Sequence, residues 1–304
     1  MALGEWFNRL FFEEYWAIAF RWLTASQAER LTCDTRIQHF TLAAAPRGAW
    51  AADPFLFRDG GETYLFCEVV KKHHKRGVIG CAKWENGRFS RPKPVLTLPC
   101  HTSYPAVFRY GDGIYMIPET RATRSVELYR AVRFPEEWAH AGTLLTGYEI
   151  EDATPLITDD GVLLMLYAPD DRADLRRLYL APLDPAACRL GALTLCATYR
   201  ARLGRPAGMV QQTSRGFVRP TQHSINRYGE RIVYKRMERK DGYLEYDVAT
   251  LSPSSIRLDQ KRRLLGVHTI NRLDDLEVID VFYRRFMPLR PLSALLSRIR
   301  GTRQ

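Results

Sequence analysis

The stretch "ADPFLFRDGGETYLFCEV", residues 52–69, joins two apolar segments through a glycine turn and carries a carboxylate near each end. Related stretches follow at residues 104–120, 154–170 and 205–221, and the prolines near their starts are 51, 50 and 51 residues apart. A period near 50 residues, with alternating apolar strands and turn glycines, is typical of β-propeller blades with about four strands each. The repeat therefore predicts a propeller.

The same pattern predicts the number of blades. Three repeats each continue into an outer hairpin, and the fourth runs through a turn at residues 241–242. Two further strands, at residues 268–270 and 276–282, are too little for a whole blade, but the aromatic segment at 14–22 can complete it and remove the open sheet edge. We expect an all-β fold, a single five-bladed β-propeller closed by N- and C-terminal strands, with short helical or disordered termini. The expected division is an N-terminal segment at residues 1–14, the propeller at 15–285 and a basic C-terminal tail at 286–304.

The net charge of +11 favours an anionic partner. After Asp280 the chain has no acidic residue, whereas it has six arginines. Within this tail, Leu292, Leu295, Leu296, Arg298 and Arg300 predict a short amphipathic helix at a membrane surface, with a disordered, solvated tail as the alternative. The sequence contains no nucleic-acid-binding motif and its aromatic residues follow the strand pattern, so we expect no nucleic acid partner.

Cysteine usage and the N-terminal segment bear on the compartment. The six cysteines form no CxxC pair, which favours reduced thiols in an intracellular protein. Charged residues interrupt the aromatic residues of the segment 1–23, so we expect no signal peptide or membrane span, with a signal anchor as the alternative. Adjacent histidines in the basic run 71–76 are poor ligands together, which predicts a solvated hairpin and no metal site. The expected location is cytoplasmic, either free or peripheral at the inner membrane face.

Repeat geometry also predicts where polar side chains meet. The innermost strand of each blade lines the channel, and the residue before each repeat proline lies where that strand begins. The second strand returns antiparallel and ends beside this point, while strand alternation places Asp152 on the same side as Thr154. The residues expected at one mouth of the channel are Asp53, Glu68, Tyr104, Glu119, Asp152, Arg205 and Arg219. Strand ends in a core do not need four carboxylates, so the pattern predicts a polar site.

Several strings at these positions resemble a known family. "ADPF", "YLFCE", "IPET", "RPAG" and "RPTQ" are similar to the N-terminal region of glucosamine inositolphosphorylceramide transferases and their stand-alone bacterial relatives. That region resembles the five-bladed propellers of the furanosidase and arabinanase glycoside hydrolase clans, and the resemblance spans residues 50–285. The recognised glycosyltransferase domain of the plant proteins is a separate segment, so the resemblance does not imply ceramide transferase activity here.

The resemblance implies roles for the carboxylates. In the resembling hydrolases the first-blade aspartate at the start of the inner strand is the base or nucleophile, and Asp53 matches it. Glycoside cleavage commonly needs a second, protonated carboxyl, for which Glu119 and Asp152 are the two candidates. Glu68 would tune pKa values or bind hydroxyls.

Other residues are candidates for substrate binding. Arg205 and Arg219 can hold a carboxylate or phosphate in bidentate fashion. The stacking face and hydrogen bonds for a sugar ring would come from Tyr104, Trp50 and His223.

Structural alternatives stay open for the same residues. Asp53 can cap a strand, and the "IPET" segment with Glu119 can be a turn. Glu68 can form a buried ion pair with Arg205 or Arg219, and one of Glu151 and Asp152 is expected to be solvated. His101 and His268 are either site residues or structural ones.

The sequence thus supports three functions. The first is a glycosyl hydrolase-like or transferase activity that cleaves or transfers a glycosyl unit in intracellular assembly of a surface glycan or glycolipid. The second is a non-catalytic sugar-binding propeller that serves a glycosyltransferase, and the third is a nucleic-acid or membrane-surface scaffold. Expected partners are a glycan, sugar phosphate or nucleotide sugar. No cofactor is expected, with calcium in the channel as the alternative.

Overall fold

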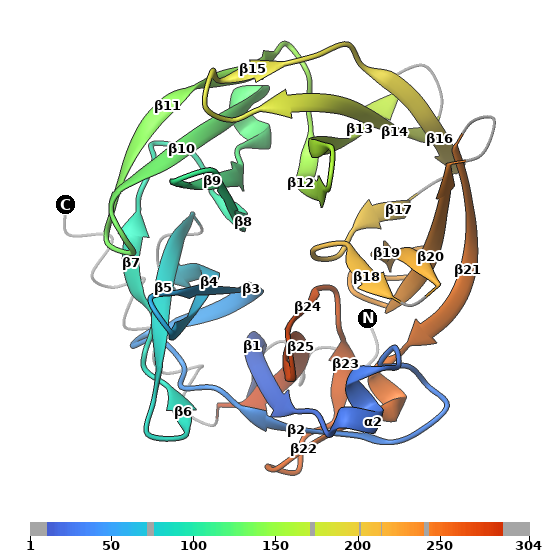
Figure 1. Ribbon diagram of the computed structural model, residues 1–304. Helices are drawn as coiled ribbons and strands as arrows, with labels where there is room; N and C mark the ends of the chain where they lie inside the picture. The colour runs from blue at the N-terminus through green and yellow to red at the C-terminus, as the bar shows by residue number, and fades with distance from the viewer. Residues whose placement is uncertain are drawn as a thin grey trace, which may run out of the picture.

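The computed structural model describes residues 11–71, 76–170, 174–200, 202–213, 215–239 and 243–287. Five sheets surround a central channel, and their inner strands ring the centre in Figure 1; strand pairing is antiparallel except for one parallel pair in the fifth sheet. Helical structure in the described residues amounts to the short helix α2 (Ala25–Ala28) and the 3₁₀ turns η1 (Arg121–Thr123) and η2 (Pro253–Ser255). The predicted all-β, five-bladed propeller is confirmed.

The first four blades follow the order of the chain. Blade one consists of β3 (Ala49–Asp59), β4 (Glu62–Lys71), β5 (Gly77–Glu85), β6 (Arg88–Phe89) and β7 (Lys93–Leu96). Blade two consists of β8 (Ser103–Tyr110), β9 (Gly113–Glu119), β10 (Ser125–Arg133) and β11 (Glu137–Thr146). Blade three consists of β12 (Glu151–Thr158), β13 (Gly161–Asp170), β14 (Leu175–Asp184), β15 (Arg189–Leu190) and β16 (Thr194–Arg200). Blade four consists of β17 (Leu203–Pro206), β18 (Gln211–Thr213), β19 (Gly216–His223), β20 (Arg231–Arg239) and β21 (Tyr243–Leu251).

Blade five closes the ring with strands from both ends of the chain. Its strands are β1 (Phe12–Trp22), β2 (Gln38–Leu42), β22 (Ile256–Leu258), β23 (Leu264–Gly266), β24 (Ile270–Leu273) and β25 (Leu276–Phe286). β1 pairs antiparallel with β25 along its whole length, from Phe12 opposite Phe286 to Trp22 opposite Leu276. Because the first and last long strands hydrogen-bond to each other, the closure predicted from segment 14–22 is confirmed.

Alternating apolar residues fill the spaces between neighbouring blades. Phe55 and Phe66 of blade one pack with Tyr104 and Met116 of blade two, and each of these side chains is at most 1% exposed. Truncating such a core aromatic typically costs about 3–5 kcal/mol. Interblade packing of this kind holds the inner strands, and hence the channel-end residues, in place.

Some sequence predictions fall on other parts of the chain. Residues 72–75 of the basic run and residues 288–304 of the basic tail lie outside the described residues. All six cysteines are free thiols. Among the described residues, no helix has the length and apolar character needed to cross a membrane.

Candidate functional site at the channel mouth

The inner strands of the first three blades share a bulge. Asp53, Tyr104 and Asp152 have positive φ angles of 50°, 44° and 52°, and each strand shifts register against its neighbour there. In blade four the shift falls at Gly204, whose φ is 77°. Positive φ is uncommon outside glycine, and such outliers concentrate at functional sites.

This bulge corrects the repeat alignment. The proline spacing aligns Thr154 and Arg205 with Asp53, whereas the register shifts show that its structural counterparts are Asp152 and Gly204. A bulge adds a residue to one strand, so the bulged position and the proline need not keep a constant offset. Asp152 is therefore the blade-three equivalent of Asp53.

Asp53 is buried and receives donors from two other blades. Its carboxylate accepts hydrogen bonds from the Tyr104 N–H at 3.2 Å and the Thr269 hydroxyl at 2.8 Å, and Oδ1 lies 3.2 Å from His268 Nε2. Burial favours the protonated form, but the charge of His268 and the hydrogen bonds from His268 and Thr269 outweigh it, so the pKa of Asp53 is lowered. Asp53 is thus held as a carboxylate.

His268 lies between two carboxylates. Its Nδ1 is 2.8 Å from Oδ2 of the fully buried Asp280. Asp280 also accepts hydrogen bonds from the N–H groups of Asp53, His268 and Thr269, each at 3.0 Å. Burial disfavours the charged imidazole, yet Asp280 and Asp53 together raise the pKa of His268 to about 10. The three side chains therefore form a charged triad that joins blade one to blade five.

The triad also has the spacing of a metal-binding group. Ligand atoms of Asp53, His268 and Asp280 lie within 4.8 Å of one another. Ca²⁺ usually takes about six to eight oxygen ligands, whereas this group offers two carboxylates separated by an imidazole. The donor set therefore fits a protonated ion-pair triad better than a calcium site, and calcium in the channel stays a prediction.

A second cluster joins blades two, three and four through Arg205. Its Nε and Nη2 donate to the two carboxylate oxygens of Asp152 at 2.6 and 2.9 Å, and Nη2 also donates to Glu119 at 3.0 Å. Asp152 accepts a further hydrogen bond from Gln222 Nε2 at 3.1 Å. Burial raises the pKa of Asp152 well above its usual range; Arg205 opposes this rise and Glu119 adds to it. Both candidate acids therefore share one cation.

Glu68 lies in β4, opposite Ala52 of β3, and contacts His101. His101 Nε2 lies 3.0 Å from Glu68 Oε1, and Nδ1 accepts a hydrogen bond from the Gly77 N–H at 3.0 Å. Gly77 permits this approach, since a Cβ there would lie 2.6 Å from Glu68 Oε1. Burial raises the pKa of Glu68, an effect that His101 opposes and Asp53 increases, while the hydrogen bond to Glu68 raises the pKa of His101. The structural alternative for Glu68 was an ion pair with Arg205 or Arg219, whereas the structure pairs it with His101.

The mouth opens into a cavity of about 400 Å³. Its lining residues are His101, Glu119, Arg121, Ala122, Arg124 and Glu149. A ligand in this cavity would reach Glu119 and His101 directly, since both belong to the buried clusters and to the cavity wall.

Tyr104 forms the floor beneath these clusters. It is 0% exposed, and its hydroxyl shares a hydrogen bond with Thr154 Oγ1 at 3.0 Å and accepts one from the Gly208 N–H at 2.8 Å. A Cβ at Gly208 would lie 2.0 Å from Ile270 O, which explains the glycine of the "RPAG" string. Because the Tyr104 ring is fully buried, it presents no stacking face to the mouth.

Arg219 does not join the mouth. It is 1% exposed and lies between blades three and four, where it donates to Glu245, to the Tyr199 hydroxyl and to Gly204 O. Residue counting from the repeat proline placed it at the end of the second strand, but in β19 it is His223 that pairs with the start of β17. Arg219 is instead a buried ion-pair residue.

The last two predicted residues are His223 and Trp50. His223 ends β19 at the mouth end of the channel and lies 3.3 Å from Arg231 Nη2. Trp50 is half-buried and packs against the core cluster that includes Tyr15 and Tyr283.

The structure adds residues that sequence reasoning missed or misplaced. Asp280 was missed, although a lone carboxylate inside the apolar string "VIDVF" signals a buried, paired charge. The expectation that one of Glu151 and Asp152 is solvated is wrong, because they are 6% and 1% exposed. Glu151 pairs with Arg121 at 2.6 Å.

A known protein family matches the part of the chain that contains most of the mouth residues. Residues 28–173 match the model of a family described as "Glucosamine inositolphosphorylceramide transferase 1, N-terminal". The resemblance inferred from the sequence is confirmed. The matched range contains Asp53, Glu68, Glu119 and Asp152 but ends before Arg205.

Two curated relatives show the extent of the likeness. The proteins named glucosamine inositolphosphorylceramide transferase 1 from Oryza sativa subsp. japonica and Arabidopsis thaliana are 35% and 40% identical over 123 and 101 residues. These matches cover 40% and 33% of this chain but 16% and 13% of the relatives. The chain thus spans less than a fifth of the length of the curated relatives it matches.

Solved structures share the fold. The native arabinanase Arb43A of Bacillus subtilis superimposes with a TM-score of 0.54 at 12% identity, covering 80% of this chain and 99% of that one. The GH43 endo-arabinanase from Bacillus licheniformis gives a TM-score of 0.52 at 14% identity, covering 80% and 96%. At such identities the likeness concerns the fold. Together with the family match, it connects this chain with carbohydrate-related propellers.

Proposed function

We propose that the channel mouth binds a glycosyl unit and cleaves or transfers it, with Asp53 as the base or nucleophile. The observation that carries this proposal is the divergence of pKa values among neighbouring buried carboxyls. The pKa of Asp53 is lowered by its donors, whereas burial raises the pKa values of Asp152 and Glu68. Carboxyls whose environments push their pKa values apart supply the base and the acid of such reactions.

Asp152 and Glu119 remain the two candidate acids. The raised pKa of Asp152 supports a proton-bearing role, and the position of Glu119 in the cavity wall supports direct contact with substrate. Arg205 holds both carboxyls in this structure. A carboxylate or phosphate group of the substrate that bound Arg205 would draw its guanidinium away and leave one carboxyl free to donate a proton.

The pairing of the carboxylates at the mouth also supports the second candidate function, a sugar-binding propeller without catalysis. Each of the carboxylates Asp53, Asp152 and Glu68 already lies within 3.2 Å of a cationic or imidazole nitrogen. Such pairing is what a purely structural or binding site would use to stabilise buried charges.

The names of the relatives refine the substrate class. The curated relatives are named as glucosamine inositolphosphorylceramide transferases, which supports a glycan, sugar phosphate or nucleotide sugar as the ligand of this mouth. We place the activity in intracellular assembly of a surface glycan or glycolipid, with the basic tail at 286–304 as the contact to the membrane surface.

The test compares Asp53→Asn with a matched variant, Asp59→Asn. Asp59 ends the same strand β3 at the other end of the channel and pairs with the exposed Arg109. Thermal shifts of wild type and both variants would be measured against glycosides, uronic acids, sugar phosphates, nucleotide sugars and calcium, and each stabilising ligand would then be assayed for turnover.

The outcomes separate the two functions. If the protein is an enzyme, at least one ligand should stabilise all three proteins. Wild type and Asp59→Asn should turn this ligand over, whereas turnover by Asp53→Asn should be lower by orders of magnitude. Binding by all three proteins without turnover of any ligand would support the sugar-binding function. If no carbohydrate stabilises the wild type, the proposal fails.

A further inference from the structure

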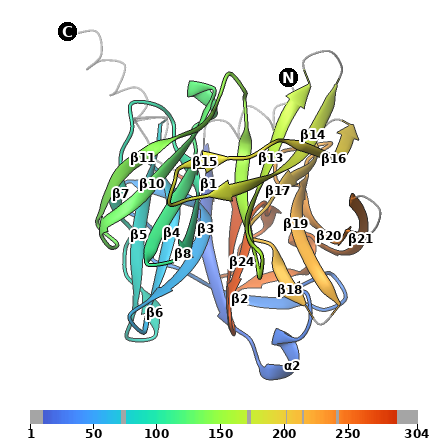
Figure 2. The same cartoon turned by 45° about the horizontal axis from the view of Figure 1, so that its top comes forward.

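The face of the propeller opposite the mouth carries a second cavity, of about 600 Å³. β19 reaches the mouth at His223, so its other end, the turn after β18, lies at the base of the propeller. α2 lies at this same end, as Figure 2 shows. The cavity, called the basal pocket below, is bounded by the segment 21–38 and by blade four.

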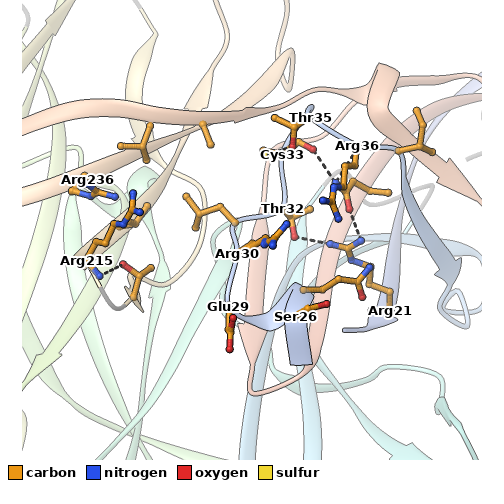
Figure 3. Close-up of a pocket in the computed structure, with 18 residues that line it drawn as sticks. Arg21, Ser26, Glu29, Arg30, Thr32, Cys33, Thr35, Arg36, Arg215 and Arg236 are labelled. Atoms are coloured by element: carbon orange, nitrogen blue, oxygen red, sulfur yellow. Dashed lines mark hydrogen bonds between the residues drawn. The ribbon is translucent and has the colours of Figure 1, made fainter. Parts of the chain in front are cut away.

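The basal pocket is lined by arginines. Arg21 comes from β1, and Arg30 and Arg36 come from the segment that joins β1 to β2. Arg215 and Arg236 come from blade four, and Figure 3 shows the two groups on opposite sides. Among the described lining residues, Glu29 is the acidic one. The pocket therefore carries an excess of positive charge.

Most of this charge is unpaired within the described part of the chain. Arg21 is engaged, since it contacts Glu277 at 2.8 Å, Gln38 at 2.5 Å and Thr32 at 2.7 Å. The other four arginines form no ion pair with a described carboxylate. Arg30, Arg36 and Arg215 are also exposed, so their guanidinium groups can move toward a ligand.

Donors exceed acceptors in the surrounding wall. Arg236 Nε is buried without a hydrogen-bond partner among the described residues. The same holds for Gln211 Nε2, which belongs to an adjoining cavity of about 640 Å³ that shares Arg30 and Thr213 with the basal pocket. The hydroxyl groups of Ser26 and Thr35 add further donors to the lining. An anion with several hydrogen-bond acceptor oxygens would complement these donors.

We propose that the basal pocket binds a phosphate ester or diphosphate group. Guanidinium groups pair with phosphate oxygens in bidentate fashion. A phosphate also carries more negative charge than a single carboxylate, so it neutralises more of the charge of the four arginines that have no described carboxylate partner. The described lining holds no aromatic side chain on which a nucleobase could stack, so the group recognised is the phosphate of a lipid headgroup or of a soluble sugar phosphate. About 600 Å³ lies within the usual range of small-ligand sites.

Two double variants test this site with equal loss of charge. Arg30→Gln with Arg215→Gln removes one exposed arginine from each side of the pocket. Arg133→Gln with Arg189→Gln removes two exposed arginines from the outer strands of blades two and three, where they pair with Glu137 and Asp184. The dissociation constants of inorganic diphosphate and glucose 1-phosphate would be measured by calorimetry on the full chain. Binding to vesicles of phosphatidylcholine with and without phosphatidylinositol phosphate would be measured by sedimentation.

If the proposal is right, wild type and the Arg133/Arg189 variant should bind the phosphate probes equally. The Arg30/Arg215 variant should bind them about a hundredfold more weakly, roughly tenfold for each arginine–phosphate pair removed. A loss confined to the soluble phosphates assigns a soluble ligand, and a loss confined to the vesicles assigns a lipid headgroup. If wild type binds none of these probes, or if both double variants lose affinity equally, the basal pocket is not a phosphate site. Binding of duplex RNA by the wild type without phosphate binding would also overturn the proposal.

Discussion

The channel mouth and the basal pocket both contain arginines, but these are paired with carboxylates to a very different extent. At the mouth, Arg205 is shared between Asp152 and Glu119, and His268 is held between Asp53 and Asp280. In the basal pocket, four arginines have no described carboxylate as a partner. Because unpaired buried charge is costly, the mouth is stabilised by its own internal pairs, whereas the exposed arginines of the base remain available to an external anion. The charges of the mouth are therefore largely neutralised within the protein, whereas the basal arginines have no described carboxylate to neutralise them.

The largest expected effect of a single charge deletion is at the mouth. Arg205→Gln should lower the free energy of unfolding by about 3 kcal/mol at pH 7, because it removes the cation and the hydrogen-bond donors that two largely buried carboxyl groups share. The deficit should become smaller as the pH falls, because burial already raises the pKa of Asp152 and its protonation removes an unpaired charge. Urea denaturation would measure both values.

Arg124→Gln is the control for this deletion. Arg124 is exposed and pairs with Glu149 at 2.8 Å, so its loss should cost less than about 0.5 kcal/mol. Equal losses for Arg205→Gln and Arg124→Gln would show that the mouth pairs contribute no more than surface ion pairs.

An intermediate effect is expected from His268 as the pH rises. Its pKa in the folded chain is about 10, above the value of about 6.5 for an unfolded histidine. A raised folded pKa stabilises the fold fully below about pH 6.5, and this stabilisation is lost as the pH rises through 10. Between about pH 7 and 8.5 the free energy of unfolding should therefore fall by roughly 1.4 kcal/mol per pH unit.

Urea denaturation of wild type and His268→Gln at several pH values would check this slope. The variant should show a much flatter dependence over the same window, because it has no imidazolium to lose. A wild-type stability that stays constant between pH 7 and 8.5 would contradict the charged state of the triad.

The smallest effect on stability is expected at the base. Arg30→Gln with Arg215→Gln should change the free energy of unfolding by less than about 0.5 kcal/mol, because both side chains are exposed and neither pairs with a described carboxylate. Thermal denaturation without phosphate would measure this value. A loss above about 2 kcal/mol would mean that the basal arginines are structural, and the contrast between the two ends would disappear.

The residue pattern predicted much of the mouth before the fold was known. The spacing of Pro54, Pro105 and Pro155 predicts repeated blades, and antiparallel pairing then brings Glu68 and Glu119 to the end where the inner strands begin. These inferences hold because strand alternation and hairpin turns are local properties of the chain.

Side-chain partners were harder to predict. The bulges at Asp53 and Asp152 change the offset between the repeat proline and the channel-end residue, and the sequence contains no marker of that change. Arg219 was placed at the mouth by counting along a repeat that the β17–β19 pairing does not follow. Each error arises from a shift of one to a few residues, which decides which way a strand side chain points.

By itself, the sequence determined the strand pattern, the blade repeat, the closure by the two chain ends and the gathering of carboxylates at one mouth, because all of these follow from periodicity along the chain. Only the tertiary structure decided that His268 and Asp280 complete the environment of Asp53, more than 200 residues away in sequence. It also decided that segment 21–38 faces blade four across an arginine-lined pocket. Such contacts depend on how separate blades and loops pack in space, and no repeat or local propensity encodes them.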